Sequence, residues 1–151
     1  MKINIYIIEK KTKDDFSRLV ENYKKMIRKY ALIEEISLFN KKITAAQNRD
    51  AIIAKKSYSE VFKPYMCGYN IALDPSAKEI DSFEFSENFA NIHILNFFIA
   101  GAYGFEDGFL KKCDKVVSLS QLTFSHKIAK VVLYEQIFRA LSIQNNHPYH
   151  K

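Results

Sequence analysis

Residues 91–101, NIHILNFFIAG, form the most hydrophobic strand that the sequence predicts. From Ile94 onward apolar side chains fill consecutive positions, interrupted only by Asn96, and the run stops at Gly101. A short, continuous apolar run bounded by a glycine is typical of a strand inside a protein core. The segments on either side must therefore supply the elements that bury it.

Strand and helix patterns alternate on both sides of this run. Residues 3–9 are apolar and β-branched, whereas 13–31 place apolar side chains at helical spacing, with acids early and bases late. Thr44 and Gln47 form a capping-box pattern that predicts the start of another helix. This alternation indicates an α/β domain with a largely parallel sheet flanked by helices. The predicted strands are 3–9, 32–39, 69–74, 91–101 and 115–120, and the predicted helices are 13–31, 44–62, 82–90, 106–112 and 126–143.

Length and composition favour one soluble domain. The chain has 151 residues, 48% of them hydrophobic, and we expect residues 1–151 to form a single domain because no linker or repeat divides them. No apolar run approaches the ~20 residues of a membrane span, and the first strand does not resemble a secretion signal. Cys67 and Cys113 are too few for a disulfide framework, so we expect two buried thiols in a reducing cytoplasm.

Positive charge is concentrated in the first part of the chain. Residues 1–63 contain 15 Lys and Arg against 8 Asp and Glu, whereas residues 64–151 contain 8 against 9. A one-sided positive field suits a polyanion such as RNA, because each neutralised phosphate releases counterions. A lysine-rich surface that only keeps the protein soluble would have the same composition, so charge alone leaves both interpretations open.

Three loops should lie at the carboxyl ends of the strands, where open parallel sheets bind ligands. They are ALDPSAK (72–78), FFIAGAYGFED (97–107) and SLSQLTFSH (118–126). Gly101 and Gly104 permit close approach to a ligand, but neither a dinucleotide fingerprint nor a phosphate loop is present, and ordinary turns explain isolated glycines. Asp74 before Pro75 is most simply a turn residue, and the third loop could cap the last helix.

The chain ends with an unusual tail. Termini are usually polar and featureless, yet residues 144–151 read QNNHPYHK and carry two of the four histidines. His147 and His150 could ligate zinc, but no Cys, Asp or Glu stands close in sequence, so we expect no metal. On the preceding helix Glu135 and Arg139 are four residues apart, which predicts a surface ion pair. Neither cysteine has a nucleophile context, and no G-x-S-x-G motif is present.

The order of these motifs resembles the ribosomal RNA large-subunit methyltransferase H family. The resemblance rests on ALD, IAGAYGF, SLSQLTFSH and RALSIQNNHPYH, and it covers essentially the whole chain. Members are small SPOUT-class enzymes that use S-adenosylmethionine to methylate N3 of a pseudouridine in 23S ribosomal RNA. The resemblance implies a C-terminal trefoil knot that general topology rules would not suggest. It also implies a cytoplasmic homodimer whose active site is completed across the interface.

The family pattern assigns site residues to this chain. The glycine loop departs from the family's IGGPEG, because Ala100 replaces a glycine that usually lies against the cofactor. In the tail, His147 or His150 could serve as base, or cationic donors could stabilise the anion instead, and the base is left unassigned. Tyr149 could stack on or hydrogen-bond to a flipped nucleobase, and Arg139 could hold a phosphate or carbonyl oxygen. The residues expected to bind the cofactor are Leu73, Ala100, Gly101, Gly104, Leu119, Ser120, Gln121, Leu122, Thr123 and Phe124, and those expected to act in catalysis are Arg139, His147, Tyr149 and His150.

Two other functions fit the same sequence. The first is a knotted RNA- or ribosome-binding protein without catalysis, which Ala100 in the glycine loop would suggest. The second is a nucleotide-binding α/β module unrelated to RNA. Binding of S-adenosylmethionine without methyl transfer would indicate the first, and ribosome binding without salt dependence would indicate the second.

Overall fold

Five parallel strands form the centre of the computed structural model, which describes residues 1–151. They form one sheet in the order β2-β1-β4-β3-β5, so the predicted α/β class is confirmed and the sheet is parallel throughout. None of the helices combines the length and the apolar composition that crossing a bilayer requires. The strands are β1 (Lys2–Ile7), β2 (Leu32–Ser37), β3 (Tyr69–Leu73), β4 (Ile94–Ile99) and β5 (Lys115–Val117).

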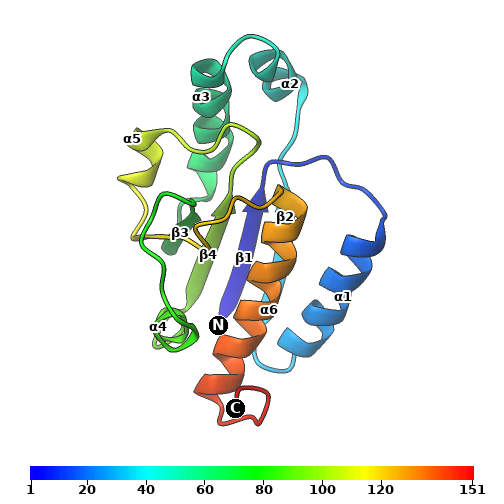
Figure 1. The fold of residues 1–151 in the computed structure, drawn as a ribbon, viewed down its shortest axis with the longest axis vertical. Coiled ribbons are helices and arrows are strands. Elements are labelled where there is room, and N and C mark those ends of the chain that lie inside the picture. The colour runs from blue at the N-terminus through cyan, green and yellow to red at the C-terminus, as the bar shows by residue number, and fades with distance from the viewer.

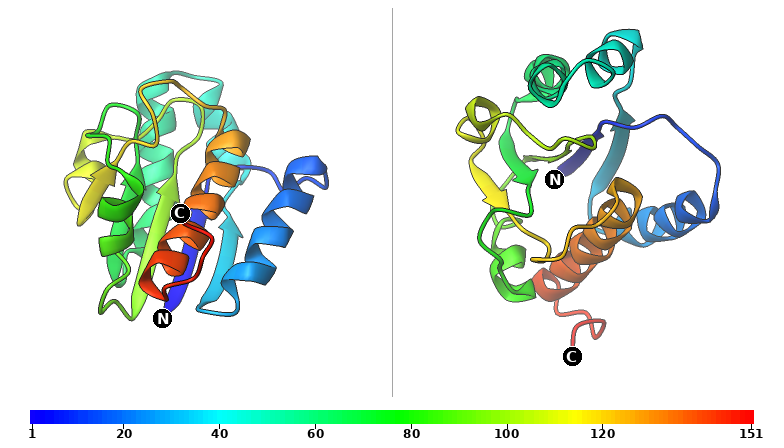
Figure 2. Two further views of the ribbon diagram at one scale, coloured as in Figure 1. Left: turned by 60° about the horizontal axis from the view of Figure 1, so that its bottom comes forward. Right: turned by 45° about the horizontal axis from the view of Figure 1, so that its top comes forward.

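Helices cover both faces of the sheet (Figures 1 and 2). On one face α6 lies between α1 and α4, and on the other lie α2, α3 and α5, which creates two separate apolar cores. The sheet is therefore the middle of three layers. The helices are α1 (Asp15–Ile27), α2 (Lys41–Gln47), α3 (Ala51–Phe62), α4 (Ser82–Glu87), α5 (Asp107–Leu110) and α6 (His126–Gln144), and a short 3₁₀ turn, η1 (Lys63–Tyr65), follows α3.

The central strand β4 is buried on both faces, as its composition predicts. Leu95 and Phe97 belong to the core beneath α1, α4 and α6, whereas Phe98 belongs to the core beneath α3 and α5. All three are completely buried. Successive side chains of a strand point to opposite faces, so a strand covered on both sides needs apolar residues at consecutive positions.

The buried exception in β4 is Asn96, which joins three neighbouring strands. Asn4 of β1 donates to the Asn96 side chain over 2.9 Å, and Asn96 donates to the Asn70 side chain of β3 over 3.0 Å. The three residues are directly paired in the sheet register. A slip of one residue would leave these amides buried without partners, so the asparagine row favours a single register.

The predicted helix over 44–62 is wrong in its start and its continuity. Two helices occupy this region, and their N-caps are Asn40 and Asp50, each accepting a hydrogen bond from the backbone N–H three residues on. Thr44 and Gln47 lie inside the first helix, so their spacing is not a capping box. The side chains of asparagine and aspartate compete with helical hydrogen bonding, and here they start new helices.

The expectation for the cysteines is also only partly met. Cys67 is exposed, because it lies in the connection that leads into β3, so the prediction of a buried thiol is wrong there. Cys113 is half-buried, and burial, followed by the nearby Asp114 carboxylate, raises the pKa of its thiol to about 12. Cys113 therefore remains a protonated thiol at neutral pH.

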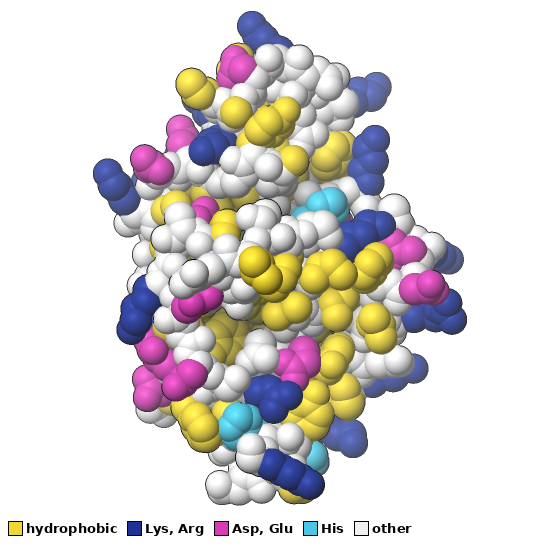
Figure 3. Space-filling model, in the orientation of Figure 1, with side chains coloured by type: hydrophobic (Ala, Val, Ile, Leu, Met, Phe, Trp, Pro, Cys, Tyr) yellow, Lys and Arg dark blue, Asp and Glu magenta, His cyan; other side chains and the backbone are white.

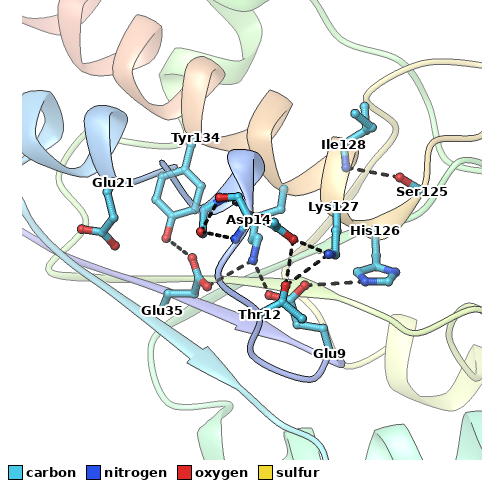
Figure 4. A network of polar contacts seen from close by, with 12 residues as sticks. Glu9, Thr12, Asp14, Glu21, Glu35, Ser125, His126, Lys127, Ile128 and Tyr134 are labelled. Carbon is cyan, nitrogen blue, oxygen red and sulfur yellow. Dashed lines mark hydrogen bonds and ion pairs between the residues drawn. The ribbon is translucent and has the colours of Figure 1, made fainter. Parts of the chain in front are cut away.

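A buried ammonium ties α6 to the sheet (Figure 4). Lys130, with a side chain only 9% exposed, pairs with Glu9 at the end of β1 and lies 3.2 Å from Glu35 of β2. The hydroxyl of Tyr134 donates to the second Glu35 oxygen over 2.8 Å. Nearer the surface, Lys127 pairs with Asp14, the N-cap of α1. One helix is thus linked to two strands and to a neighbouring helix.

We expect Lys130→Met to destabilise the protein strongly, because it leaves the buried Glu9 without its close cation and Glu35 with Lys24 alone, at 3.4 Å. Removing one partner of a buried ion pair costs about 3–5 kcal/mol. Lys127→Met is the matched control: it removes the same charge from the same helix at a more exposed pair and should cost much less. Equal free energies of unfolding for the two variants in urea would contradict this prediction.

The loss at Lys130 should depend on pH. Burial alone would raise the pKa of Glu35, but the Lys130 ammonium and the Tyr134 hydroxyl outweigh it, and the pKa lies below its ordinary value. A carboxyl with a depressed folded-state pKa stabilises the fold above the unfolded-state pKa of ~4.3, and this contribution is lost as pH falls through the folded-state value. In Lys130→Met, Glu35 protonates more readily, so the penalty should shrink near about pH 4.

Candidate functional site

The three loops at the carboxyl edge of the sheet enclose one cavity of about 510 Å³. The loops after β3, β4 and β5 supply most of its wall, and the first turn of α6 completes it. A cavity of this size accommodates a nucleoside-sized ligand. Its wall contains nine of the ten residues predicted to bind a cofactor, namely Leu73, Ala100, Gly101, Gly104, Leu119, Ser120, Leu122, Thr123 and Phe124.

Gln121 is the predicted cofactor residue that does not line the cavity. Its backbone N–H donates to a Glu79 carboxylate oxygen over 2.7 Å, and its side-chain amide lies 3.3 Å from the other oxygen. The contact holds the loop after β5 against the segment between β3 and α4. Gln121 therefore shapes the loop from outside, which its place in the motif does not reveal.

Hydroxyl groups of the loop after β5 are used mainly within the loop. Ser118 is buried and donates to the Ser120 carbonyl over 2.8 Å, while the Ser120 hydroxyl accepts from the backbone N–H of Leu122 over 3.0 Å. Ser125 is the N-cap of α6. The loop is thus held in shape by its own polar groups, and backbone and apolar side chains dominate the wall of the cavity.

The two glycines in the cavity wall, Gly101 and Gly104, are required for different structural reasons. A Cβ on Gly101 would lie 2.7 Å from the ring of the buried Tyr58, so this glycine is required by packing on the side away from the cavity. Gly104 has φ +76°, a left-handed conformation, and a Cβ there would meet nothing within 4 Å. Of these two residues, only Gly104 combines a positive φ with open space beside the Cα. Asp74 accepts from the Ser76 backbone N–H over 2.9 Å, which confirms the predicted turn.

The four predicted catalytic residues gather at the opposite end of α6. The Arg139 guanidinium binds Glu135, confirming that ion pair, and lies 4.8 Å over the Tyr149 ring and 3.3 Å from His150 Nδ1. His147 packs edge-on against Phe138 of the same helix. Figure 1 shows the C-terminus beside the end of α6, beyond the amino edge of the sheet. The tail is therefore folded onto its own helix.

Tail and cavity are separated by the length of α6. The helix has 19 residues and begins at His126, which lines the cavity, so at ~1.5 Å per residue its far end lies ~28 Å away. Within one chain the predicted catalytic residues and the predicted cofactor residues do not meet. No group of three His, Cys, Asp or Glu side chains is arranged to hold a metal ion.

The surroundings of Arg139 and Tyr149 raise the pKa values of both residues. Burial and then the Glu135 carboxylate raise the pKa of Tyr149 to about 12, and the hydroxyl donates to Glu135 over 3.1 Å. The hydrogen bond to Glu135 also raises the pKa of Arg139. Tyr149 is therefore a proton donor at neutral pH and Arg139 a permanent cation, so neither serves as a general base.

Comparison with known proteins establishes the family. The family model described as "Predicted SPOUT methyltransferase" matches residues 1–150 of the chain. The chain belongs to the SPOUT methyltransferase family. It is therefore a methyltransferase, and the family resemblance seen in its motifs is confirmed.

Relatives with full-length similarity are named ribosomal RNA large subunit methyltransferase H. The chain is 52% identical over 151 residues to the protein of Aliarcobacter butzleri and 52% identical over 153 residues to that of Sulfurovum sp.. It is 50% identical over 151 residues to a protein of that name from Campylobacter jejuni subsp. jejuni. In all three comparisons both chains are covered completely. SPOUT methyltransferases generally use S-adenosylmethionine.

His126 is a wall residue of the cavity to which the motifs assign no role. It is the first residue of α6, and its Nε2 lies 3.6 Å from a carboxylate oxygen of the buried Glu9 (Figure 4). Lys130 holds the other oxygen of the same carboxylate. The available signal was its place as the last residue of SLSQLTFSH, but Glu9 is too far away in sequence to be recognised as its partner.

We expect Gly101→Ala to destabilise the fold, because the added methyl group would overlap the Tyr58 ring. Overpacking of this kind costs about 1–3 kcal/mol. Gly108→Ala is the control, since a Cβ at Gly108 in α5 meets nothing within 4 Å and alanine favours a helix. Urea unfolding of both variants tests the packing role, and an unchanged stability of Gly101→Ala would exclude it.

Proposed function

We propose that this protein is an S-adenosylmethionine-dependent methyltransferase that modifies N3 of a pseudouridine in large-subunit ribosomal RNA, and that it acts as a homodimer. The observation that carries the proposal is the full-length identity of about half to relatives named for large-subunit ribosomal RNA methylation. The cavity at the carboxyl edge of the sheet adds physical support, because nine of the ten residues predicted to bind the cofactor line it.

The cavity suits S-adenosylmethionine. Its wall is largely apolar, as the adenine ring requires, and Gly104 leaves an open place where a side chain would intrude. We propose that Leu73, the loop at Gly104 and the loop of residues 119–124 hold the cofactor. When bound, S-adenosylmethionine supplies an electrophilic methyl group on a sulfonium. Ala100 lies in the wall without closing the cavity, so nothing in the structure favours the alternative of a non-catalytic binding protein.

The acceptor needs help to lose its proton. The N3 proton of a uracil-type ring has a pKa well above neutral, so a base, or donors to the ring carbonyls, must assist. Tyr149 and Arg139 both donate hydrogen bonds, which suits stabilisation of the negative charge that develops on the carbonyl oxygens. We propose that His147 or His150 takes the proton. Transfer then depends mainly on aligning the acceptor nitrogen with the methyl group.

A dimer resolves the separation between tail and cavity. Because α6 places the tail of a chain ~28 Å from its own cavity, we propose that the tail of one subunit closes the cavity of the other. Figure 3 shows apolar side chains gathered over α6 and α1 on this face. Leu19 of α1 and Ile128 of α6 are 47% and 37% exposed, and Leu122 in the loop before α6 is 73% exposed. Large apolar side chains left exposed together are typical of protein interfaces.

We also propose the family's trefoil knot for the C-terminal part. Its support here is the close path of the loop after β5 along the segment between β3 and α4. The backbone N–H of Ser118 donates to the Lys78 carbonyl over 3.2 Å, and Gln121 binds Glu79. Two segments about forty residues apart in the chain are thus fastened together beside the cavity.

Removal of the tail should separate binding from transfer. We expect deletion of residues 147–151 to leave S-adenosylmethionine affinity within a few-fold of wild type but to lower single-turnover methyl transfer by at least ~10²–10⁴, because the acid/base groups are lost. Tyr149→Phe should cost less, since the ring remains. Gly104→Val should instead abolish S-adenosylmethionine binding in calorimetry, because the left-handed backbone at this position is strained by any side chain. Near-normal transfer without the tail would place the chemistry elsewhere.

Mixed dimers test whether the site is shared. One subunit carries the 147–151 deletion and the other carries Gly104→Val, so each alone is inactive. If the tail acts on the partner's cavity, one of the two sites has an intact cavity and an intact tail, and about half of wild-type transfer should return. If each tail acts on its own cavity, both sites remain defective. Light scattering that shows only monomers at micromolar concentration would exclude the dimer itself.

A further inference from the structure

We infer that the loop between β1 and α1, together with the start of α2 and the turn before α3, binds the backbone phosphates that flank the methylated nucleotide. This inference rests on the proposed ribosomal RNA substrate and adds the surface that holds it. We call this surface the basic rim. Its residues are the exposed cations Lys10, Lys11, Lys13, Lys41, Lys42 and Arg49.

In the loop between β1 and α1, residues that contact α6 alternate with lysines that do not. Its sequence is EKKTKD, residues 9–14, and the first, fourth and sixth side chains all contact α6 (Figure 4). Glu9 binds Lys130, and Asp14 binds Lys127. The Lys127 ammonium also donates to the Thr12 hydroxyl over 3.1 Å. The lysines between these anchors are exposed, and none forms an ion pair.

The second part of the basic rim adjoins the first. Lys41 and Lys42 open α2, Arg49 lies in the turn between α2 and α3, and none of the three has a carboxylate partner. Lys10 lies 5.3 Å over the ring of Phe39, just before α2, and this contact connects the two parts. The surface therefore presents positive charge that the protein itself does not neutralise.

The basic rim lies next to the cavity along the same edge of the sheet. β1 and β4 are neighbours, and the backbone N–H of Ile8, just past β1, donates to the Ile99 carbonyl at the cavity wall over 3.1 Å. Glu9, which anchors the loop, also contacts His126 in the wall. An RNA strand whose target base enters the cavity would pass over these lysines. Because the loop is already anchored, little entropy is lost when it binds phosphates.

The test compares two triple variants with the same loss of charge. The first is Lys10→Gln/Lys11→Gln/Lys13→Gln in the basic rim. The second is Lys63→Gln/Lys111→Gln/Lys112→Gln, three exposed and unpaired lysines that precede β3 and β5 at the amino edge of the sheet. Dissociation constants for purified 50S subunits and 70S ribosomes are measured between about 50 and 300 mM KCl. Thermal unfolding and S-adenosylmethionine affinity serve as controls for folding and for the cavity.

We expect the rim variant to bind the preferred particle ~10²-fold more weakly near 0.1 M salt and to lower the salt slope by ~2–3, one for each lost phosphate contact. The control variant should stay within a few-fold of wild type. Equal losses of ribosome affinity in both variants would show that only net charge matters, and would contradict the proposal that the basic rim binds RNA. So would a rim variant that keeps ribosome binding but loses binding to phosphatidylglycerol vesicles, since the surface would then serve a membrane.

The two proposals can fail separately. If wild-type protein methylates ribosomes and the rim variant binds and transfers as well as wild type, the basic rim is wrong and the proposed function stands. If wild-type protein binds S-adenosylmethionine but transfers no methyl group to either particle, the proposed function fails and the rim proposal fails with it.

Discussion

The structure depends on one buried ammonium, that of Lys130. It bridges the carboxylates of Glu9, just past β1, and Glu35, within β2, and thereby fixes how α6 lies across the sheet. Transferring three charged groups from water is costly, and an apolar contact would stabilise the helix at least as well. An apolar contact, however, would tolerate sliding by a turn, whereas the ion network accepts one position. We interpret the network as a device for placement, since the cavity lies at one end of α6 and the predicted catalytic residues lie at the other.

The placement of α6 explains why the predicted catalytic residues and the cavity lie apart within one chain. At its first residue the helix lines the cavity through His126, and at its last turns it carries Arg139 and the folded tail. A straight helix cannot bring its two ends together. Pairing two chains in opposite directions can bring the end of one helix to the beginning of the other, so the length of α6 makes a shared site geometrically simple.

Sequence patterns predicted what depends on local composition and missed what depends on distant partners. The consecutive apolar residues of β4 predicted its burial, because no other environment accommodates them. The break between α2 and α3 was missed, since Asn40 and Asp50 look like ordinary polar residues until their capping bonds are seen. Gln121 shares a motif with wall residues, but Glu79 turns it away from the cavity. Lysine at position 130 likewise resembles a surface residue on a helix, and its two carboxylates come from the first forty residues.

The motif SLSQLTF has a different physical meaning from the one its polar residues suggest. Its serines bond mainly to the loop itself, so their hydroxyls maintain a shape and leave the cavity wall to backbone and apolar groups. A loop that is already shaped loses little entropy when a ligand binds, which favours affinity without charged contacts. Such a cavity suits a cofactor with an apolar ring, whereas the lysines outside it suit a polyanion. The two proposed kinds of recognition would thus lie apart along one edge of the sheet, with the anchored loop of residues 9–14 at their border.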